Sequence, residues 1–300
     1  MSIVVSNISK AYKDVKALKN ISFEVKEGEL FGLIGPDGAG KTTLFRILTT
    51  LLIADEGQAT VADFDLLKDY IAIRESIGYM PGRFSLYQDL TVEENLKFFA
   101  TIFGTTIEEN YELIEDIYVQ IEPFKSRRAG KLSGGMKQKL ALCCALIHKP
   151  TVLFLDEPTT GVDPVSRKEF WEMIKRLQLK GITILVSTPY MDEAALCDQI
   201  ALIQDGEILE IDTPQAIIKH YPKSIYNVSA DNMYHLIQSL KAYEHSHSVY
   251  PFGEFVHYTD KRAGFDPDQL KQYLTENLLS NITIEITEPT IEDAFMELAK

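Results

Sequence analysis

Basic residues are scarce in this chain. Its 300 residues include 30 Lys and Arg against 44 Asp and Glu, which gives a formal net charge of −14 at pH 7. Proteins that bind nucleic acid need a surplus of Lys and Arg for phosphate contacts. The shortage argues against DNA or RNA as a partner, and we expect no nucleic-acid binding.

Cysteines and long apolar runs are also scarce. Cys143, Cys144 and Cys197 lack C-x-x-C spacing, so we expect reduced cysteines in the core. The longest apolar runs, such as residues 141–147, are too short to span a bilayer, and residues 1–6 lack the basic and apolar blocks of a signal peptide. The sequence predicts a cytoplasmic protein that reaches a membrane only through a partner.

A glycine-rich segment at residues 35–42 fits the pattern G-x-x-x-x-G-K-[ST]. Apolar residues 30–34 predict a buried strand before it, and residues 43–48 open a helix after it. Such a loop turns its backbone N–H groups toward an anion, while Lys41 reaches the β and γ phosphates and Thr42 is placed to ligate Mg²⁺. The predicted nucleotide contacts are Gly35, Pro36, Asp37, Gly38, Ala39, Gly40, Lys41, Thr42 and Thr43.

Two carboxylates follow a second apolar run. Residues 151–155 predict a strand buried on both faces, and Asp156 and Glu157 come directly after it. Paired acids after a strand are commonly a solvated turn, but ligands of parallel sheets bind beyond the carboxyl ends of the strands. We therefore expect Asp156 to face the Mg²⁺ held by Thr42 and Glu157 to lie toward the attacking water.

Residues 132–136 read Leu-Ser-Gly-Gly-Met and stand ahead of a predicted helix at 137–147. Two glycines at a helix start are a second possible phosphate site. By itself the pattern is weak.

Together, the loop at residues 35–42, the run at 132–136 and the pair Asp156 and Glu157 resemble, in order and spacing, the ATP-binding subunit of ABC transporters. The resemblance covers about residues 1–215. It implies an α/β P-loop NTPase fold, with a RecA-like core, an antiparallel β lobe and a helical lobe. It also implies a head-to-tail dimer, in which each ATP lies between one subunit's phosphate loop and the other's Ser133, Gly134 and Gly135.

The resemblance also implies roles for single residues. Tyr12, otherwise an exposed aromatic residue in a polar loop, is similar to the adenine-stacking residue of the family. Asp163 lies in the loop that crosses the dimer, and Asp156 is the second Mg²⁺ contact beside Thr42. The implied catalytic residues are Glu157, as the base, and Lys41.

Two positions depart from the family pattern. Gly82 stands where the family has a glutamine that reaches Mg²⁺ and water, and Pro189 stands where it has a histidine that contacts the γ-phosphate. Gln88 is the nearest candidate to replace the glutamine. Losing both groups should slow the chemistry by on the order of 10² to 10⁴ while leaving binding largely intact. In one hypothesis the site on this chain's own phosphate loop is degenerate, while its intact Ser133, Gly134 and Gly135 complete a competent site on a different, partner ATPase. In the alternative, a homodimer hydrolyses ATP slowly through Glu157.

Past a boundary near residues 214–224, the chain predicts a second, α+β domain. We assign residues 1–218 to the nucleotide-binding domain, with its helical subdomain at about 83–150, and residues 224–300 to an accessory domain. The ending at 288–295 resembles ATPases of ABC-2 type exporters. His245 and His247 lie in a polar stretch and read as a solvated loop rather than a metal site.

The resemblance therefore implies the ATPase subunit of an ABC exporter, bound to the inner face of the membrane through a separate ABC-2 type permease. It also implies that the permease docks at about residues 81–99. A second hypothesis is a non-hydrolysing regulatory or structural partner of another ABC ATPase. A soluble ABC ATPase without a transport role would usually carry two cassettes or a coiled-coil insertion, and neither is present in this sequence.

Overall fold

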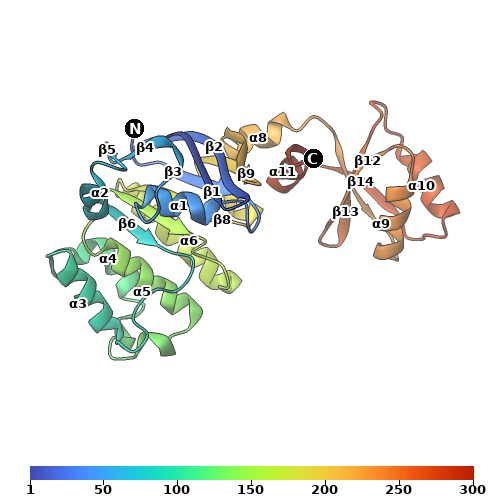
Figure 1. Ribbon diagram of the computed structural model, residues 1–300. Helices are drawn as coiled ribbons and strands as arrows, with labels where there is room; N and C mark the ends of the chain where they lie inside the picture. The colour runs from blue at the N-terminus through green and yellow to red at the C-terminus, as the bar shows by residue number, and fades with distance from the viewer. The chain divides into compact units, whose positions relative to one another are not determined.

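The computed structural model describes residues 1–300, and the chain divides into two compact units. The first comprises Met1–Gln215 with Ala299, and the second comprises Ala216–Leu298 with Lys300 (Figure 1). Helix α8 (Pro214–His220) contains the boundary between them. None of the helices combines the length and apolar content that a membrane span requires.

The core of the first unit is a six-stranded sheet in the order β10-β9-β3-β8-β7-β6, parallel except for the antiparallel pair β9 and β10. Every residue of β3, β7 and β8 is buried, as expected of parallel strands covered on both faces. The carboxyl ends of these three strands therefore meet at one edge. Their bounds are β3 (Leu30–Ile34), β6 (Ile77–Met80), β7 (Val152–Asp156), β8 (Thr183–Thr188), β9 (Gln199–Gln204) and β10 (Glu207–Asp212).

A second sheet, in the order β2-β1-β4-β5, is wholly antiparallel. Its alternating apolar residues, among them Ile3, Val5 and Ile8, pack in one core with Leu44 and Phe45 of α1. This core fixes the helix that follows the glycine-rich loop. The elements are β1 (Ile3–Tyr12), β2 (Val15–Val25), β4 (Glu56–Val61), β5 (Phe64–Asp65), α1 (Lys41–Leu48) and α2 (Tyr70–Ser76).

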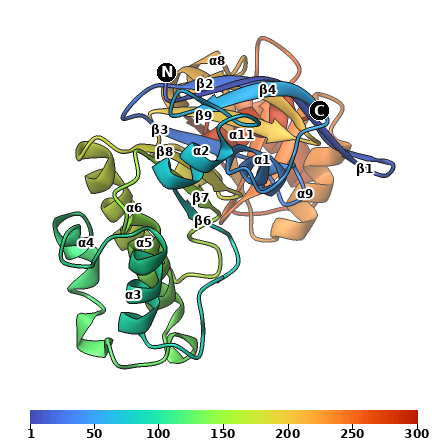
Figure 2. The same ribbon diagram turned by 60° about the vertical axis from the view of Figure 1, so that its left-hand side comes forward.

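Three helices, α3, α4 and α5, pack together on one side of the first unit in both views (Figures 1 and 2). Helix α3 begins with a capping box in which Thr91 Oγ1 accepts from Glu94 N and Glu94 Oε2 accepts from Thr91 N. Helix α5 begins at Gly134, three residues before its predicted start, because Ser133 caps it. The bounds are α3 (Val92–Ile102), α4 (Tyr111–Tyr118), α5 (Gly134–Leu146), α6 (Pro164–Leu179) and α7 (Met191–Ala194), with short 3-10 turns at Glu122–Phe124 and Ala129–Lys131.

The second unit is a four-stranded antiparallel sheet in the order β12-β13-β11-β14. Val228, Val256 and Tyr258 form its main core with Leu236 of α9 and Leu270 of α10. The elements are β11 (Ile225–Ser229), α9 (Met233–Ala242), β12 (Ser246–Phe252), β13 (Phe255–Asp260), α10 (Pro267–Glu276), β14 (Thr283–Thr287) and α11 (Ile291–Leu298).

The expected loop was wrong for His247, whereas His245 lies in the turn before β12. Ser246 pairs with Asp260, so the strand β12 starts there, and His247 lies within it. His247 Nε2 lies 3.0 Å from Glu297 Oε1, and His257 on β13 pairs with Asp293 at 2.7 Å. Both carboxylates belong to α11. These polar pairs join α11 to the sheet.

Candidate nucleotide site

The glycine-rich loop lies between β3 and α1, at the carboxyl edge of the core sheet. Gly38 and Gly40 adopt left-handed backbone angles, with φ of 84° and 104°. A Cβ atom at Gly35 would lie 2.1 Å from the carbonyl oxygen of Ile203, so this position cannot hold a side chain. The loop is closely fitted to the strands around it, and the free N–H groups of the first turn of α1 face its interior.

Lys41 is the first residue of α1, and its side chain is buried. Its Nζ donates hydrogen bonds to the carbonyl oxygens of Gly35 at 2.8 Å and Pro36 at 2.9 Å, and it lies 3.2 Å from Glu157 Oε1. A buried ammonium group needs compensating negative charge. Here the Glu157 carboxylate supplies that charge, and the two neutral carbonyls only accept hydrogen bonds; phosphate oxygens can take over both roles.

The acidic pair lies at the end of β7, two strands from β3 in the sheet order. Asp156 is 2% exposed, and its Oδ1 accepts a hydrogen bond from Ser187 Oγ at 2.7 Å. Glu157 has a left-handed φ of 49°, unusual for a residue other than glycine and common at functional sites. Burial, and then the charge of Asp156, raise the pKa of the nearby Tyr79 to about 12, so this phenol stays neutral.

Gly82 borders the acidic pair. A Cβ atom built on it would lie 3.0 Å from the carbonyl oxygen of Asp156 and 3.8 Å from Glu157 Cβ. A side chain at position 82 would therefore begin beside both acids, and glycine contributes none. Pro189 directly follows β8 at the same edge and has no N–H to donate.

Gln88 does not replace the missing glutamine. Its carbonyl oxygen accepts a hydrogen bond from Gly130 N at 2.9 Å, and its side chain borders Gly130. No hydrogen bond joins Gln88 to the acidic pair. The sequence-based hypothesis that it could substitute has no support in this geometry.

Tyr12, Ser133, Gly134, Gly135 and Asp163, the other predicted nucleotide contacts, make no hydrogen bond or ion pair with the phosphate loop of the same chain. Tyr12 is 45% exposed at the end of β1, opposite Val15. Its hairpin partner strand, β2, passes the loop at Ala17, whose carbonyl oxygen would lie 2.5 Å from a Cβ atom on Gly40. Tyr12 thus stands on the hairpin that borders the loop, with its ring free.

Ser133, Gly134 and Gly135 form the exposed start of α5. Ser133 Oγ accepts from Met136 N at 3.4 Å, and a Cβ atom on Gly135 would lie 2.9 Å from Ser166 Oγ. Asp163 caps α6 through a hydrogen bond from Ser166 N at 3.0 Å, which lowers the pKa of its carboxyl group. Ser166 therefore links the two predicted dimer segments, and no hydrogen bond or ion pair joins them to the phosphate loop.

Sequence reasoning missed a buried carboxylate at this edge. Glu193 on α7 is 2% exposed and accepts hydrogen bonds from Thr159 Oγ1 at 2.7 Å and Thr188 Oγ1 at 2.5 Å. It ties the loop after Glu157 to the end of β8. The one sequence signal for Glu193 is its position, four residues after Pro189.

The residues of this edge fit a nucleotide with Mg²⁺. The loop is closed to side chains at Gly35, the amine of Lys41 lacks a full set of charged partners, and Ser187 is the one donor to the Asp156 carboxylate. Thr42 follows Lys41 on the first turn of α1. A glycine-rich loop between a buried strand and a helix, with an acid pair at the end of a neighbouring strand, defines a P-loop nucleotide-binding protein.

Comparison with known proteins assigns the family. The model of the ABC transporter family matches residues 18–160. The chain is 40% identical to the "Probable multidrug ABC transporter ATP-binding protein YbhF" of Escherichia coli K12 over 95% of its own length, and it spans about half, 49%, of that relative. It is 34% identical to the "Nod factor export ATP-binding protein I" of Rhizobium sp. N33, over 99% of this chain and 97% of that one.

A solved structure agrees. The chain resembles the dimeric ATP-binding cassette MJ0796 in a post-hydrolysis state bound to ADP and Pi, with a TM-score of 0.64 and 26% identity over 70% of this chain and 98% of that one. The chain belongs to the ABC transporter family, among its ATP-binding proteins. The predicted α/β P-loop fold is confirmed.

Proposed function

We propose that this chain is the ATP-hydrolysing subunit of an ABC exporter, with MgATP bound at the edge formed by the phosphate loop and the acid pair. The observation that carries the proposal is the meeting of Lys41 and Glu157, 116 positions apart, at 3.2 Å over the glycine-rich loop. The names of the relatives, which include "multidrug" and "Nod factor export", favour an exporter.

Each residue has a distinct task in this proposal. The loop residues 35–43 hold the phosphates, Lys41 neutralises their charge, and Thr42 and Asp156 hold Mg²⁺. Mg²⁺ supplies charge stabilisation to the transferring phosphoryl group. Glu157 loses its ion pair when phosphate oxygens occupy the amine of Lys41, and its carboxylate then accepts a proton from the attacking water. The ring of Tyr12 stacks on adenine.

We further propose a head-to-tail dimer. At the start of α5, Ser133 and Gly134 are exposed and Gly135 is half-buried, so a second subunit can reach this segment. A helix N-terminus favours a phosphate group through its free N–H groups. Ser166 contacts both Gly135 and Asp163, so Asp163 lies near the start of α5 and would also reach the dimer interface. The dimeric state of MJ0796 supports this arrangement by analogy.

A groove of about 360 Å³ suits the proposed permease. It is lined mainly by apolar side chains of β6, of the segment after it, of α3 and of α5, among them Met80, Leu86, Phe99 and Ala145. Of its lining residues, Pro81, Ser85, Leu86 and Phe99 fall within the expected docking range of 81–99. An amphipathic helix binds such a groove through its apolar face. We propose that an ABC-2 type membrane permease docks here and holds the chain at the inner face of the membrane.

Gly82 and Pro189 favour a second candidate for the chain's own site. Both positions lie at the acid pair or the strand end beside it, and neither offers a side-chain donor. The chain would then bind ATP as the slow or non-hydrolysing half of a pair with a second ABC ATPase. A homodimer that works slowly through Glu157 is the alternative.

Steady-state ATP hydrolysis by the purified chain with Mg²⁺, beside a direct ATP-binding assay, tests the proposal. We expect slow turnover that falls at least about 100-fold in Glu157→Gln, because the base is lost while binding remains. Binding without Glu157-dependent turnover would establish the non-hydrolysing candidate instead. Absence of ATP binding would refute both.

A further inference from the structure

Ser187 holds a central place at the edge where the acid pair lies. It is the penultimate residue of β8, the strand between β3 and β7, and its side chain is fully buried. In the parallel pairing of β7 and β8, Asp156 lies opposite Ser187. The sequence motifs gave no reason to select this serine, because it lies 31 positions from Asp156.

The hydroxyl of Ser187 bonds to both acidic residues. Its Oγ donates to Asp156 Oδ1 at 2.7 Å and accepts from the backbone N–H of Glu157 at 3.0 Å. The carbonyl oxygen of Ser187 also accepts from Glu157 N at 3.0 Å. A hydroxyl group has one donor and two acceptor sites, so Ser or Thr can make this pair of bonds and an apolar residue cannot.

The bond to Asp156 fixes one of the two carboxylate oxygens. A carboxylate that ligates a metal is oriented by its hydrogen-bond partners, and loss of such a partner lowers metal affinity. Ser187 is the only residue that donates a hydrogen bond to the side chain of Asp156. The other carboxylate oxygen, Oδ2, is then held in a single orientation in which it can ligate the metal.

The bonds to Glu157 fix its backbone. Its left-handed φ of 49° is disfavoured for a residue with a side chain and persists only where the surroundings hold it. Both acceptors for its N–H belong to Ser187. This backbone conformation directs the carboxylate toward Lys41, 3.2 Å away.

Positions 82 and 189 add no further donor, and the one other hydroxyl at the pair, Thr160 Oγ1, donates to Glu157 Oε2 over a long 3.4 Å. Gly82 has no side chain although its Cβ position borders both acids, and Pro189 has no N–H. Positioning of the two carboxylates therefore depends on the end of β8 more than it would with polar residues at 82 and 189.

We propose that Ser187 is the positioning residue of this site: a single hydroxyl sets Asp156 for the metal and Glu157 for the attacking water. The inference rests on the proposed function. If Ser187 positions Asp156, its hydroxyl affects the affinity of the site for the metal, which can be measured separately from turnover.

The test measures Mn²⁺ affinity, as a probe for Mg²⁺, by electron paramagnetic resonance on the full chain with a non-hydrolysable ATP analogue. Ser187→Ala is expected to weaken Mn²⁺ binding by about 10- to 100-fold. Affinity for the analogue without metal should not change, because the phosphate loop is intact. Ser187→Thr keeps the hydroxyl and should retain metal binding.

Thr183→Ala is the matched control. Thr183 lies at the other end of β8 and is 2% exposed, and its Oγ1 accepts one partly buried hydrogen bond, from Gly28 N at 3.0 Å, which the variant loses. It should leave Mn²⁺ affinity unchanged. Should Ser187→Ala fail to fold, Ser187→Cys is nearly isosteric with a weak donor and is expected to lower metal affinity in the same direction.

The outcomes separate the two proposals. Wild-type metal affinity in folded Ser187→Ala, or an equal loss in Thr183→Ala, overturns the role of Ser187 and leaves the proposed ATPase function standing. A wild-type chain that binds no nucleotide overturns the proposed function and this inference with it. Loss of metal affinity confined to the Ser187 variants without a hydroxyl supports the proposal.

Discussion

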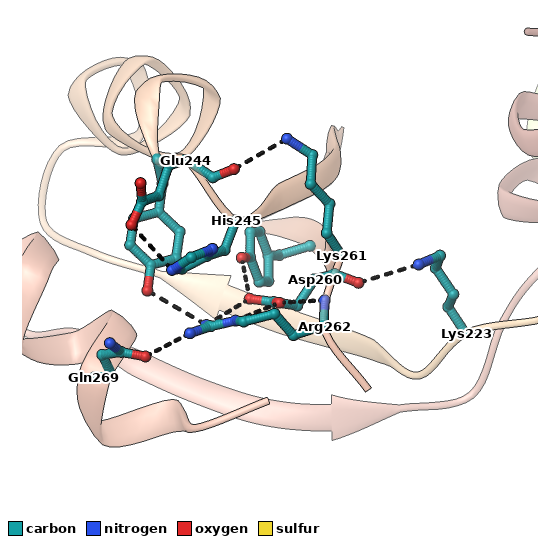
Figure 3. Close-up of polar contacts among 9 residues, drawn as sticks. Lys223, Glu244, His245, Asp260, Lys261, Arg262 and Gln269 are labelled. Carbon is teal, nitrogen blue, oxygen red and sulfur yellow. Dashed lines mark hydrogen bonds and ion pairs between the residues drawn. The ribbon is translucent and has the colours of Figure 1, made fainter. Parts of the chain in front are cut away.

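The nucleotide site and the cluster around Arg262 in the second unit both bring opposite charges together, and they differ in how fully those charges are satisfied. Asp260 accepts from Arg262 Nε and Nη2, each at 2.9 Å, and from Tyr258 Oη at 2.8 Å (Figure 3). Arg262 Nη1 donates to Gln269 Oε1 at 2.6 Å. The guanidinium and carboxylate groups thus find their partners within the unit.

Lys41 presents the opposite case. Its amine is buried, yet two of its three partners are neutral carbonyls and the third is a carboxylate to which we assign another task. A network such as that of Arg262, in which each charged group has charged or polar partners within the unit, stabilises the fold. A buried charge such as that of Lys41, whose partners are mostly neutral, can instead bind an anionic ligand. The three predictions below test this difference, from the largest expected effect to the smallest.

Lys41→Ala should abolish tight nucleotide binding. Removing one partner of a buried, hydrogen-bonded charge pair costs about 2–5 kcal/mol, so ATP affinity should fall by roughly 30-fold or more. A fluorescent ATP analogue measures the change. Asp260→Asn serves as the control and should bind the analogue as the wild type does; equal losses in both variants would contradict the contrast between the sites.

Gly82→Gln combined with Pro189→His should raise Mg²⁺-dependent turnover about 10- to 100-fold, because each restores a polar group at the acid pair. The Cβ position of residue 82 lies 3.0 Å from the Asp156 carbonyl oxygen, so the backbone must shift by a few tenths of an ångström. Turnover is compared with that of Gln88→Ala, expected to match the wild type. An unchanged rate in the double variant would mean that these two positions do not limit hydrolysis.

Asp260→Asn should lower the free energy of unfolding of the second unit by about 2 kcal/mol at pH 7, since charge-assisted hydrogen bonds weaken. Burial raises the pKa of Asp260, but hydrogen bonds from Arg262 and Tyr258 outweigh it, and the net pKa lies below the usual 3.8. This stabilisation is therefore present above pH 3.8 and is lost as the pH falls through the lowered pKa.

Urea unfolding of the full chain at pH 7 and at pH 3 or below measures this effect. The difference between wild type and Asp260→Asn should shrink toward acid pH. A difference that stays constant with pH would show that Asp260 does not act through its charge.

Local patterns were sufficient for several parts of the fold. The strand before the phosphate loop and the helix after it depend on neighbouring residues, and the structure contains both. Three strands of the core sheet, β6, β9 and β10, were not predicted. The start of strand β12 was taken for a loop, because Ser246 and His247 are polar and their pairing with β13 is not visible in the sequence.

The amino-acid sequence by itself determined the chemistry available to this protein: glycines that allow a left-handed turn, a lysine and threonine beside them, and two acids after an apolar strand. Those features act over a few residues, so spacing reveals them. Tertiary structure alone decided how the acids are held. Ser187 and Gly82 lie at the acid pair, and Glu193 ties the loop after Glu157 to the end of β8, because parallel strands align their carboxyl ends. Such alignment brings together residues that no sequence pattern connects.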